Sequence, residues 1–292
     1  MEVAYSVTDN LTNTAIKTPI AIQGVEGSYH HIAARKYFGA DIDLVKCDRF
    51  EGLFSALEQD EAKFAVMAIE NTVAGTILPN YALLRESNYR IIGEVYLPIE
   101  HQLLCIKGQS ILQMQEVRSH PMALLQCGRF FKQFPKMKLV EQVDTALSAK
   151  ELSKNPQMGV AVVASKLAAQ LFDLQILKSS IEDNKRNFTR FLVLEEKTGF
   201  NLENPIANKA SVCFHLGHRV GSLAGILAFI AGFKLNLTKI QSLPLVGKEW
   251  EYFFHLDMEF DDYENFIEAM ETLRNLTKDL QILGEYKKGE RP

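Results

Sequence analysis

From Pro19 onward, short apolar runs alternate with stretches of helical periodicity, and this alternation constrains the fold more than any other feature of the chain. The apolar runs are strand-sized and predict strands at 20–22, 42–45, 64–69, 138–140 and 159–163. The periodic stretches predict helices near 28–39, 50–59, 77–86, 121–134, 144–154 and 164–172. Strand–helix alternation is typical of an α/β fold with a largely parallel sheet.

The C-terminal part has a different order of elements. Residues 196–208 contain two breakers, Gly199 and Pro205, and little periodicity, which predicts a linker between domains. The pattern beyond the linker predicts strand 209–215, helix 221–232, strands 235–241 and 250–258, helix 262–276 and strand 279–285. This is the βαββαβ order of a ferredoxin-like domain. The edge strand of such a sheet needs a partner, so we expect a homodimer or homotetramer through this domain.

Three polar motifs follow predicted strands directly. Residues 24–34 follow strand 20–22, residues 69–75 close strand 64–69, and residues 119–127 follow the short run 116–118. Ligands bind α/β sheets at the carboxyl ends of strands, where loops meet helix N-termini. The sequence therefore predicts a ligand cleft at these loops.

A fourth segment, 187–191, reads Asn-Phe-Thr-Arg-Phe and opens an apolar run. Near the start of this strand, the hydroxyl of Thr189 can share a proton, and the guanidinium of Arg190 can hold an anion. We expect both side chains at the edge of the cleft.

In this order and at these separations, the four segments resemble prephenate dehydratase, the enzyme that converts prephenate into phenylpyruvate, water and carbon dioxide. The resemblance covers all but the ends of the chain. Residues 209–285 resemble the ACT regulatory domain that follows the catalytic region in that family. The resemblance implies no cofactor, because aromatisation of the substrate drives the reaction.

The resemblance also implies an architecture. The family's catalytic region has two lobes, as in type II periplasmic-binding proteins, with the active site between them. Here the catalytic domain would be 19–195, with lobe one formed by 19–97 and 178–195 and lobe two by 98–177. The ACT regulatory domain would be 209–292.

Site residues follow from the same resemblance. Thr189 matches the catalytic threonine, and Arg190 beside it would provide an electropositive setting. The expected substrate contacts are Ser28, Tyr29, Glu70, Asn71, Thr72, Gly75, Ser119, His120, Gln126 and Phe191. Two of these have structural interpretations as well, since Asn71 could cap the next helix and His120 precedes a proline at a helix start. His30 stands where the family usually has Ser or Thr.

The family binds phenylalanine at the interface between ACT domains. The residues implied for this chain are Gly221, Ser222, Leu223, Asn236, Leu237, Gln241 and Ser242. Gln241 and Leu243 replace the Glu and Arg of the family's loop. The loss of both charges predicts weaker coupling between L-phenylalanine binding and activity.

Charge and composition exclude several classes of function. A formal net charge of -4 argues against a nucleic-acid partner. The apolar stretch 220–233 is too short to span a membrane, and polar residues 1–18 predict a flexible tail rather than a signal peptide, so we expect a cytoplasmic protein. The four cysteines are scattered, and His215 and His218 lack further ligands nearby, so we expect no metal. Arogenate dehydratase and a non-catalytic amino-acid sensor remain alternatives.

Overall fold

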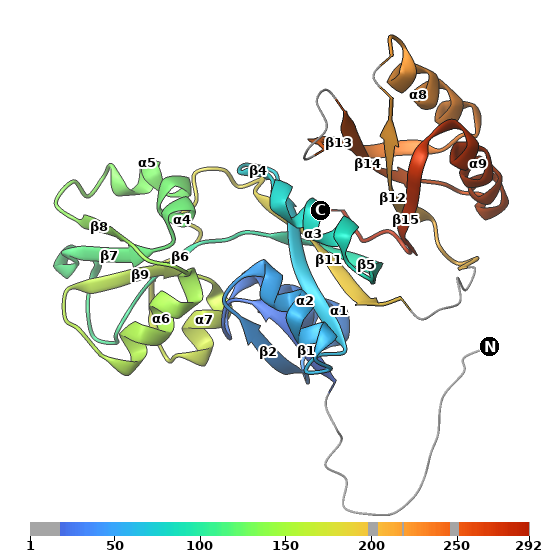
Figure 1. Cartoon of the computed structure of the whole chain (residues 1–292). Helices are drawn as coiled ribbons and strands as arrows, with labels where there is room; N and C mark the ends of the chain where they lie inside the picture. Colours follow the sequence, from blue (N-terminus) through green and yellow to red (C-terminus); the bar gives the residue numbers. More distant parts are fainter. Residues whose placement is uncertain (1–17, 198–203, 218, 246–250, 292) are drawn as a thin grey trace, which may run out of the picture.

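The computed structural model describes residues 18–197, 204–217, 219–245 and 251–291. Residues 1–17 of the predicted tail, residues 198–203 of the predicted linker, and His218 lie outside the described residues. The described elements form three blocks, each built on one sheet (Figure 1). The prediction of an α/β fold is confirmed.

The first block is a six-stranded sheet with the order β2-β1-β3-β11-β5, in which β4 also pairs with β3. Its strands are β1 Pro19–Gln23, β2 Asp43–Cys47, β3 Phe64–Asn71, β4 Gly75–Thr76, β5 Tyr89–Pro98 and β11 Phe188–Glu196. Apolar side chains alternate between its two faces, as the period of a strand requires. One face packs on α1 Tyr29–Phe38, and the other packs on α2 Phe50–Glu58 and α3 Leu78–Glu86.

The second block is a five-stranded sheet with the order β10-β6-β9-β7-β8. Its strands are β6 Gln102–Cys105, β7 Glu116–Ser119, β8 Lys138–Glu141, β9 Val160–Ala164 and β10 Gln175–Lys178. The short helices α4 Pro121–Gln126 and α5 Gly128–Phe131 pack on one face, and α6 Thr145–Lys154 and α7 Lys166–Leu171 pack on the other. A 3-10 turn, η1 Ile111–Gln113, precedes β7.

The expectation of a largely parallel sheet is wrong. The strands β2, β1 and β3 are parallel, but β11 is antiparallel to both β3 and β5. In the second block β7, β8 and β9 are parallel, while β6 is antiparallel to β9 and β10. The reason is that the chain leaves the first block directly from β5 into β6 and returns from β10 into β11. The return enters β11 at Phe188, opposite Pro98 where β5 ends, so β11 runs antiparallel to β5.

The helix predicted over 121–134 is broken at Cys127. The segment that returns to the first block intervenes there. The backbone N–H of Asp183 donates to the carbonyl of Gln126 (2.7 Å), and the Asp183 carboxylate accepts from the N–H of Arg129 (3.0 Å). These bonds replace the helical ones and attach the returning segment to the second block.

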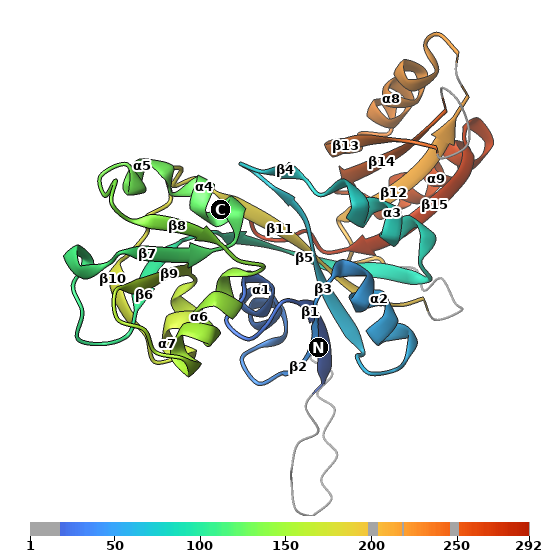
Figure 2. The same cartoon turned by 60° about the vertical axis from the view of Figure 1, so that its left-hand side comes forward.

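The third block is a four-stranded sheet with the order β13-β14-β12-β15. Its strands are β12 Lys209–Leu216, β13 Asn236–Pro244, β14 Tyr252–Glu259 and β15 Lys278–Tyr286. Helices α8 Ser222–Gly232 and α9 Tyr263–Leu276 cover one face. The opposite face packs against β5 and α3 of the first block, and Figures 1 and 2 both show the third block beside the first and remote from the second.

The four cysteines are buried and free. In the part of the chain that the structure describes, no helix is both long and apolar enough to cross a membrane.

Candidate active site

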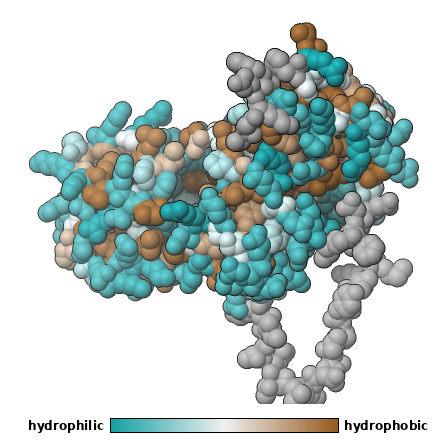
Figure 3. All heavy atoms as spheres, in the orientation of Figure 1, coloured by the Kyte–Doolittle hydropathy of each residue, from teal (hydrophilic) through white to brown (hydrophobic). Residues whose placement is uncertain are grey.

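A cleft of about 590 Å³ is lined by residues of both the first and second blocks. The face shown in Figure 3 is hollowed between these blocks, with apolar side chains inside. Its volume is in the range of small-molecule sites, about 300–1,000 Å³. The polar and aromatic lining residues include Ser28, Tyr29, His30, Arg49, Asn71, His101, His120, Gln126, Asp144, Thr189 and Phe191.

Thr189 and Asn71 lie opposite each other on β11 and β3 at the mouth of the cleft. The side-chain oxygen of Asn71 accepts from the N–H groups of Val73 (2.9 Å) and Ala74 (2.7 Å), which fixes the orientation of the amide. Its nitrogen therefore donates to the Thr189 hydroxyl oxygen (2.9 Å). Because that oxygen accepts this bond, the hydroxyl proton of Thr189 remains available for a molecule in the cleft.

The Asn71 amide also begins a hydrogen-bonded chain that crosses between the blocks. Asn71 donates to the side-chain oxygen of Asn187 (2.7 Å), and the amide nitrogen of Asn187 donates to Gln126 (3.1 Å). The same oxygen of Gln126 lies 2.9 Å from Nε2 of His101, and Nδ1 of His101 lies 2.9 Å from the Tyr29 hydroxyl. Four of its side chains, all except buried Asn187, line the cleft with Thr189. This chain orients cleft residues from both blocks.

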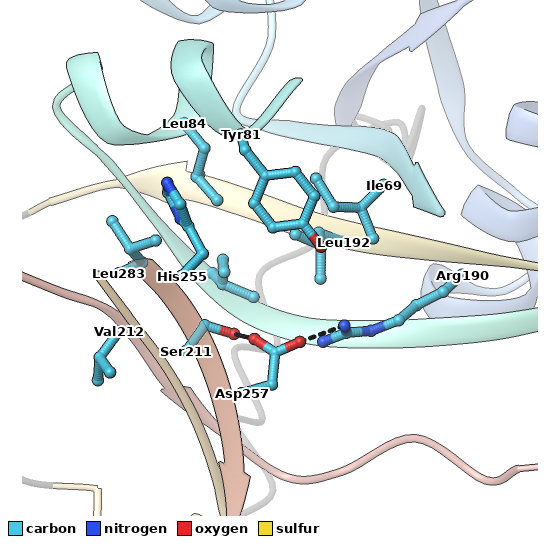
Figure 4. A pocket seen from close by; sticks show the side chains of 11 residues that line it. Ile69, Tyr81, Leu84, Arg190, Leu192, Ser211, Val212, His255, Asp257 and Leu283 are labelled. Carbon is cyan, nitrogen blue, oxygen red and sulfur yellow. Dashed lines mark hydrogen bonds and ion pairs between the residues drawn. The ribbon is translucent and has the colours of Figure 1, made fainter. Parts of the chain in front are cut away.

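The interpretation that Arg190 holds a substrate anion is wrong. Successive strand residues point to opposite faces, so Thr189 and Phe191 face the cleft and Arg190 faces the third block. The Arg190 side chain is 2% exposed and does not line the cleft. It donates to Glu94 (2.6 Å) and to the hydroxyl of Tyr286 (3.1 Å), and it is ion-paired with Asp257 (Figure 4).

The Arg190 side chain belongs to a largely buried charge cluster between the first and third blocks. We define this ion-pair cluster as Arg190, Glu70, Glu94, Lys209, Lys239 and Asp257. Lys209 reaches both oxygens of Glu94 at 2.9 Å, and Lys239 reaches Glu70 at 2.6 Å. Burial is the largest influence on the Asp257 carboxyl and alone would raise its pKa, but Arg190, Ser211 and Lys209 together hold this pKa below its ordinary value.

Four expected substrate contacts also lie outside the cleft lining. Glu70 belongs to the ion-pair cluster, on the same face as Arg190. Ser119 is fully buried and donates to the carbonyl of Val163 (2.6 Å). The Thr72 hydroxyl donates to the carbonyl of Arg186 (3.1 Å), and Gly75 forms the hairpin strand β4 with a positive φ of 88°. These residues shape the loops around the site.

The other predicted contacts line the cleft: Ser28, Tyr29, Asn71, His120, Gln126 and Phe191. Two of them also cap helices. Ser28 accepts from the N–H of His31 (3.2 Å) at the start of α1, and His120 accepts from the N–H of Met122 (3.2 Å) at the start of α4. Asn71 does not cap α3, as the alternative interpretation had it, but closes the turn at residues 71–74.

Several residues that line the cleft were not predicted from the sequence, notably Arg49, His101 and Asp144. Arg49 follows β2 and Asp144 follows β8, so both stand just after the carboxyl ends of parallel strands, where the rule that found the other loops also applies. Among the described lining residues Arg49 is the only Lys or Arg. With Arg190 turned away, Arg49 is the cation available to a carboxylate in the cleft.

The residues expected to bind phenylalanine do not come together within one chain. Ser222 and Leu223 line a pocket of about 110 Å³ with Tyr252, next to Gly221 at the start of α8. Gln241 and Ser242 lie on the edge strand β13. Asn236 and Leu237 begin β13 and pair with Glu259 and Met258 at one end of β14. The pocket residue Tyr252 is at the other end of β14, where it pairs with Pro244.

Two buried histidines predict acid sensitivity of the fold. Burial lowers the pKa of His30 to about 3 and that of His255 to about 4. Their unfolded pKa values are near 6.5, so their neutral forms stabilise the fold above that pH, and this contribution is lost as pH falls toward 4 and 3. We expect unfolding free energy to fall by about 2–3 kcal/mol per histidine between pH 7 and 4.5.

Urea denaturation at several pH values measures this loss. His255→Leu is the matched variant, since His255 is remote from the cleft lining and the variant should show a shallower decline below pH 6.5. A decline as steep as that of the natural chain would exclude His255 as its source.

Among the described residues, no group of three or more His, Cys, Asp or Glu is placed to hold a metal ion. The cleft instead offers hydrogen-bond donors, one arginine and a hydroxyl with an available proton. A cleft of this kind between two α/β blocks is that of an enzyme acting on a small polar molecule.

Comparison with known proteins identifies the family. The prephenate dehydratase family model matches residues 20–199, and the chain belongs to this family. Arogenate dehydratase/prephenate dehydratase 2, chloroplastic, from Arabidopsis thaliana is 34% identical, over 96% of this chain and 75% of that protein. Prephenate dehydratase from Arthrobacter aurescens in complex with L-Phe has a TM-score of 0.82 and 25% identity, over 92% of this chain and 90% of that one. GqqA, described as a quorum quenching acylase, has a TM-score of 0.83 and 28% identity, over 92% and 98% of the two chains.

Proposed function

We propose that this chain catalyses the decarboxylating dehydration of prephenate to phenylpyruvate in the cytoplasm, as a carbon–oxygen lyase of L-phenylalanine biosynthesis. The observation that carries the proposal is the Thr189 hydroxyl, which lines the cleft and whose oxygen accepts from Asn71, so that its proton is available to a bound molecule. A sensor would bind its ligand without needing such a hydroxyl.

The proposed reaction breaks two bonds of the substrate. The electron pair of the bond to the ring carboxylate moves into the ring as carbon dioxide leaves, and the ring hydroxyl departs with its own bonding pair. One proton is taken up, so that prephenate dianion and a proton give phenylpyruvate anion, carbon dioxide and water. Thr189 donates to the departing oxygen, and Arg49 holds the side-chain carboxylate. Apolar walls such as Phe191 favour the loss of charge at the ring carboxylate.

Purified protein mixed with prephenate at neutral pH should form phenylpyruvate, and arogenate should be turned over more slowly. Formation of phenylpyruvate separates an enzyme from a sensor. Arogenate turnover at a higher kcat/KM would assign the alternative substrate. An acylated amine is the third compound to test, because GqqA carries the name of an acylase. Cleavage of this amide without turnover of prephenate would overturn the proposal.

We also propose that residues 19–195 form a two-lobed catalytic domain, 196–208 a linker and 209–292 an ACT regulatory domain. The third block supports this proposal through its βαββαβ order and its two helices on one face. Strand β13 is an edge strand, paired on one side with β14. A second copy that pairs there would bring its own β13 beside this one and form a homodimer or homotetramer.

L-Phenylalanine is the proposed allosteric ligand of this domain, at an interface that includes Gly221 and β13. Saturating phenylalanine should weaken prephenate binding by about five- to tenfold, since Gln241 and Leu243 lack the charges of the family's loop and the coupling lies in the lower part of the usual range. Calorimetry and inhibition curves measure binding and coupling together. If millimolar phenylalanine neither binds the protein nor inhibits the reaction, the domain has a role in assembly only.

A further inference from the structure

His30 has an unpartnered donor at the wall of the cleft. It lies in the first turn of α1 and is 8% exposed. Its Nε2 accepts from the backbone N–H of Ala68 on β3 (3.3 Å). The pairing of β3 with β1 ends at Val66, so Ala68 lies beyond the last strand partner on that side and takes the imidazole instead.

This contact fixes the tautomer of the ring. Nε2 must keep its lone pair to accept from Ala68, so the neutral ring carries its proton on Nδ1. Burial lowers the pKa of His30 to about 3, and the ring is therefore neutral at ordinary pH. Among the described residues the ring is hydrogen-bonded at Nε2 alone, which leaves Nδ1 without a partner there, and His30 lines the cleft. The result is a fixed, uncharged N–H donor on a residue that lines the cleft.

The position of this donor along the cleft is set by β11. The His30 ring packs edge-on against Phe191, with ring centroids 5.0 Å apart. Phe191 is two residues from Thr189, which corresponds to about 7 Å along a strand. A substrate whose leaving hydroxyl meets Thr189 carries its other two substituents at the opposite end of the six-membered ring. Those substituents therefore lie near Phe191 and His30.

We propose that His30 is a specificity-determining residue whose Nδ1–H donates to the side-chain keto oxygen of the substrate, so that the site selects the keto acid over the corresponding amino acid. The proposal rests on the proposed function. A donor on the ring carboxylate would hold the charge that must be lost, whereas a keto oxygen is a neutral acceptor. An ammonium group in its place has no lone pair, and two donors would then face each other.

The test compares kcat/KM for prephenate and arogenate in the natural chain and three variants. His30→Phe keeps a ring of similar size and removes the donor. His30→Asn places an amide N–H close to the position of Nδ1. His31→Gln is the control, because His31 is outside the cleft lining and bonds the N–H of Gly27 (3.0 Å).

We expect His30→Phe to lower kcat/KM for prephenate by about 10- to 100-fold and that for arogenate by less than about threefold. His30→Asn should retain most of the preference, and His31→Gln should retain all of it. The preference should be constant from pH 5 to 9, since the ring does not ionise there. Equal losses for both substrates in His30→Phe, with prephenate turnover intact in the natural chain, would overturn this inference alone. A natural chain inactive on both substrates would instead overturn the proposed function and this inference with it.

Discussion

Thr189→Val is expected to lower kcat for prephenate by about a hundredfold or more while the protein stays folded. Valine has nearly the shape of threonine but lacks the hydroxyl, so the departing oxygen loses its donor. The structural consequence is small, because the Asn71 amide still donates to Asn187 (2.7 Å) and to the carbonyl of Phe188 (3.2 Å). Steady-state kinetics and circular dichroism measure the two effects.

Thr72→Val is the matched control for this variant. The Thr72 hydroxyl donates to Arg186 and accepts from the N–H of Phe188 (2.9 Å), and it does not line the cleft. Its loss should lower stability by about 1 kcal/mol and leave kcat within a few-fold. Near-normal turnover in folded Thr189→Val would remove Thr189 from the mechanism.

The second large effect is expected on stability. Arg190→Met should lower the free energy of unfolding by about 3–5 kcal/mol, because it leaves buried carboxylates of the ion-pair cluster without their main partner. Glu94 has a fully buried side chain, and Asp257 is 8% exposed. Arg190→Lys should be intermediate, since an ammonium cannot reproduce a planar guanidinium that contacts Glu94, Asp257 and Tyr286 together.

Arg90→Met provides the comparison. Arg90 pairs with Glu195 on the neighbouring strand, but the two side chains are 32% and 24% exposed. Solvent screens such a pair, and its loss should change the unfolding free energy by less than about 1 kcal/mol. Denaturant unfolding of both variants measures the two losses of unfolding free energy. Similar small losses at Arg90 and Arg190 would mean that burial does not strengthen the cluster.

Much of the first block followed from the sequence because its signals are local. Strand β3 is a continuous apolar run that ends at Asn71, and α/β sheets bind ligands at such carboxyl ends. Thr189 lies near the start of antiparallel β11, which brings it to the same edge of the sheet. The strand β6 was not predicted, because four residues carry too little periodicity to distinguish a strand.

The role of Arg190 could not be predicted in the same way. Alternation along β11 separates it from Thr189, but its partners Glu94, Asp257 and Tyr286 lie 67 or more residues away. Pairing of β5 with β11 brings Glu94 close, and only the packing of the third block on the first adds Asp257 and Tyr286. His30 is similar, since its donor is defined by the backbone of Ala68, 38 residues away.

The ion-pair cluster has a consequence for any attempt to exchange modules between members of this family. Arg190 directly follows Thr189, and Glu70 directly precedes Asn71, so each of these two cleft residues adjoins a charge that is paired with the third block. A chimera joined in the 196–208 segment would carry half of the charges from each parent. Transplanting the C-terminal part therefore requires Lys209, Lys239 and Asp257, or an equivalent set, to travel with it.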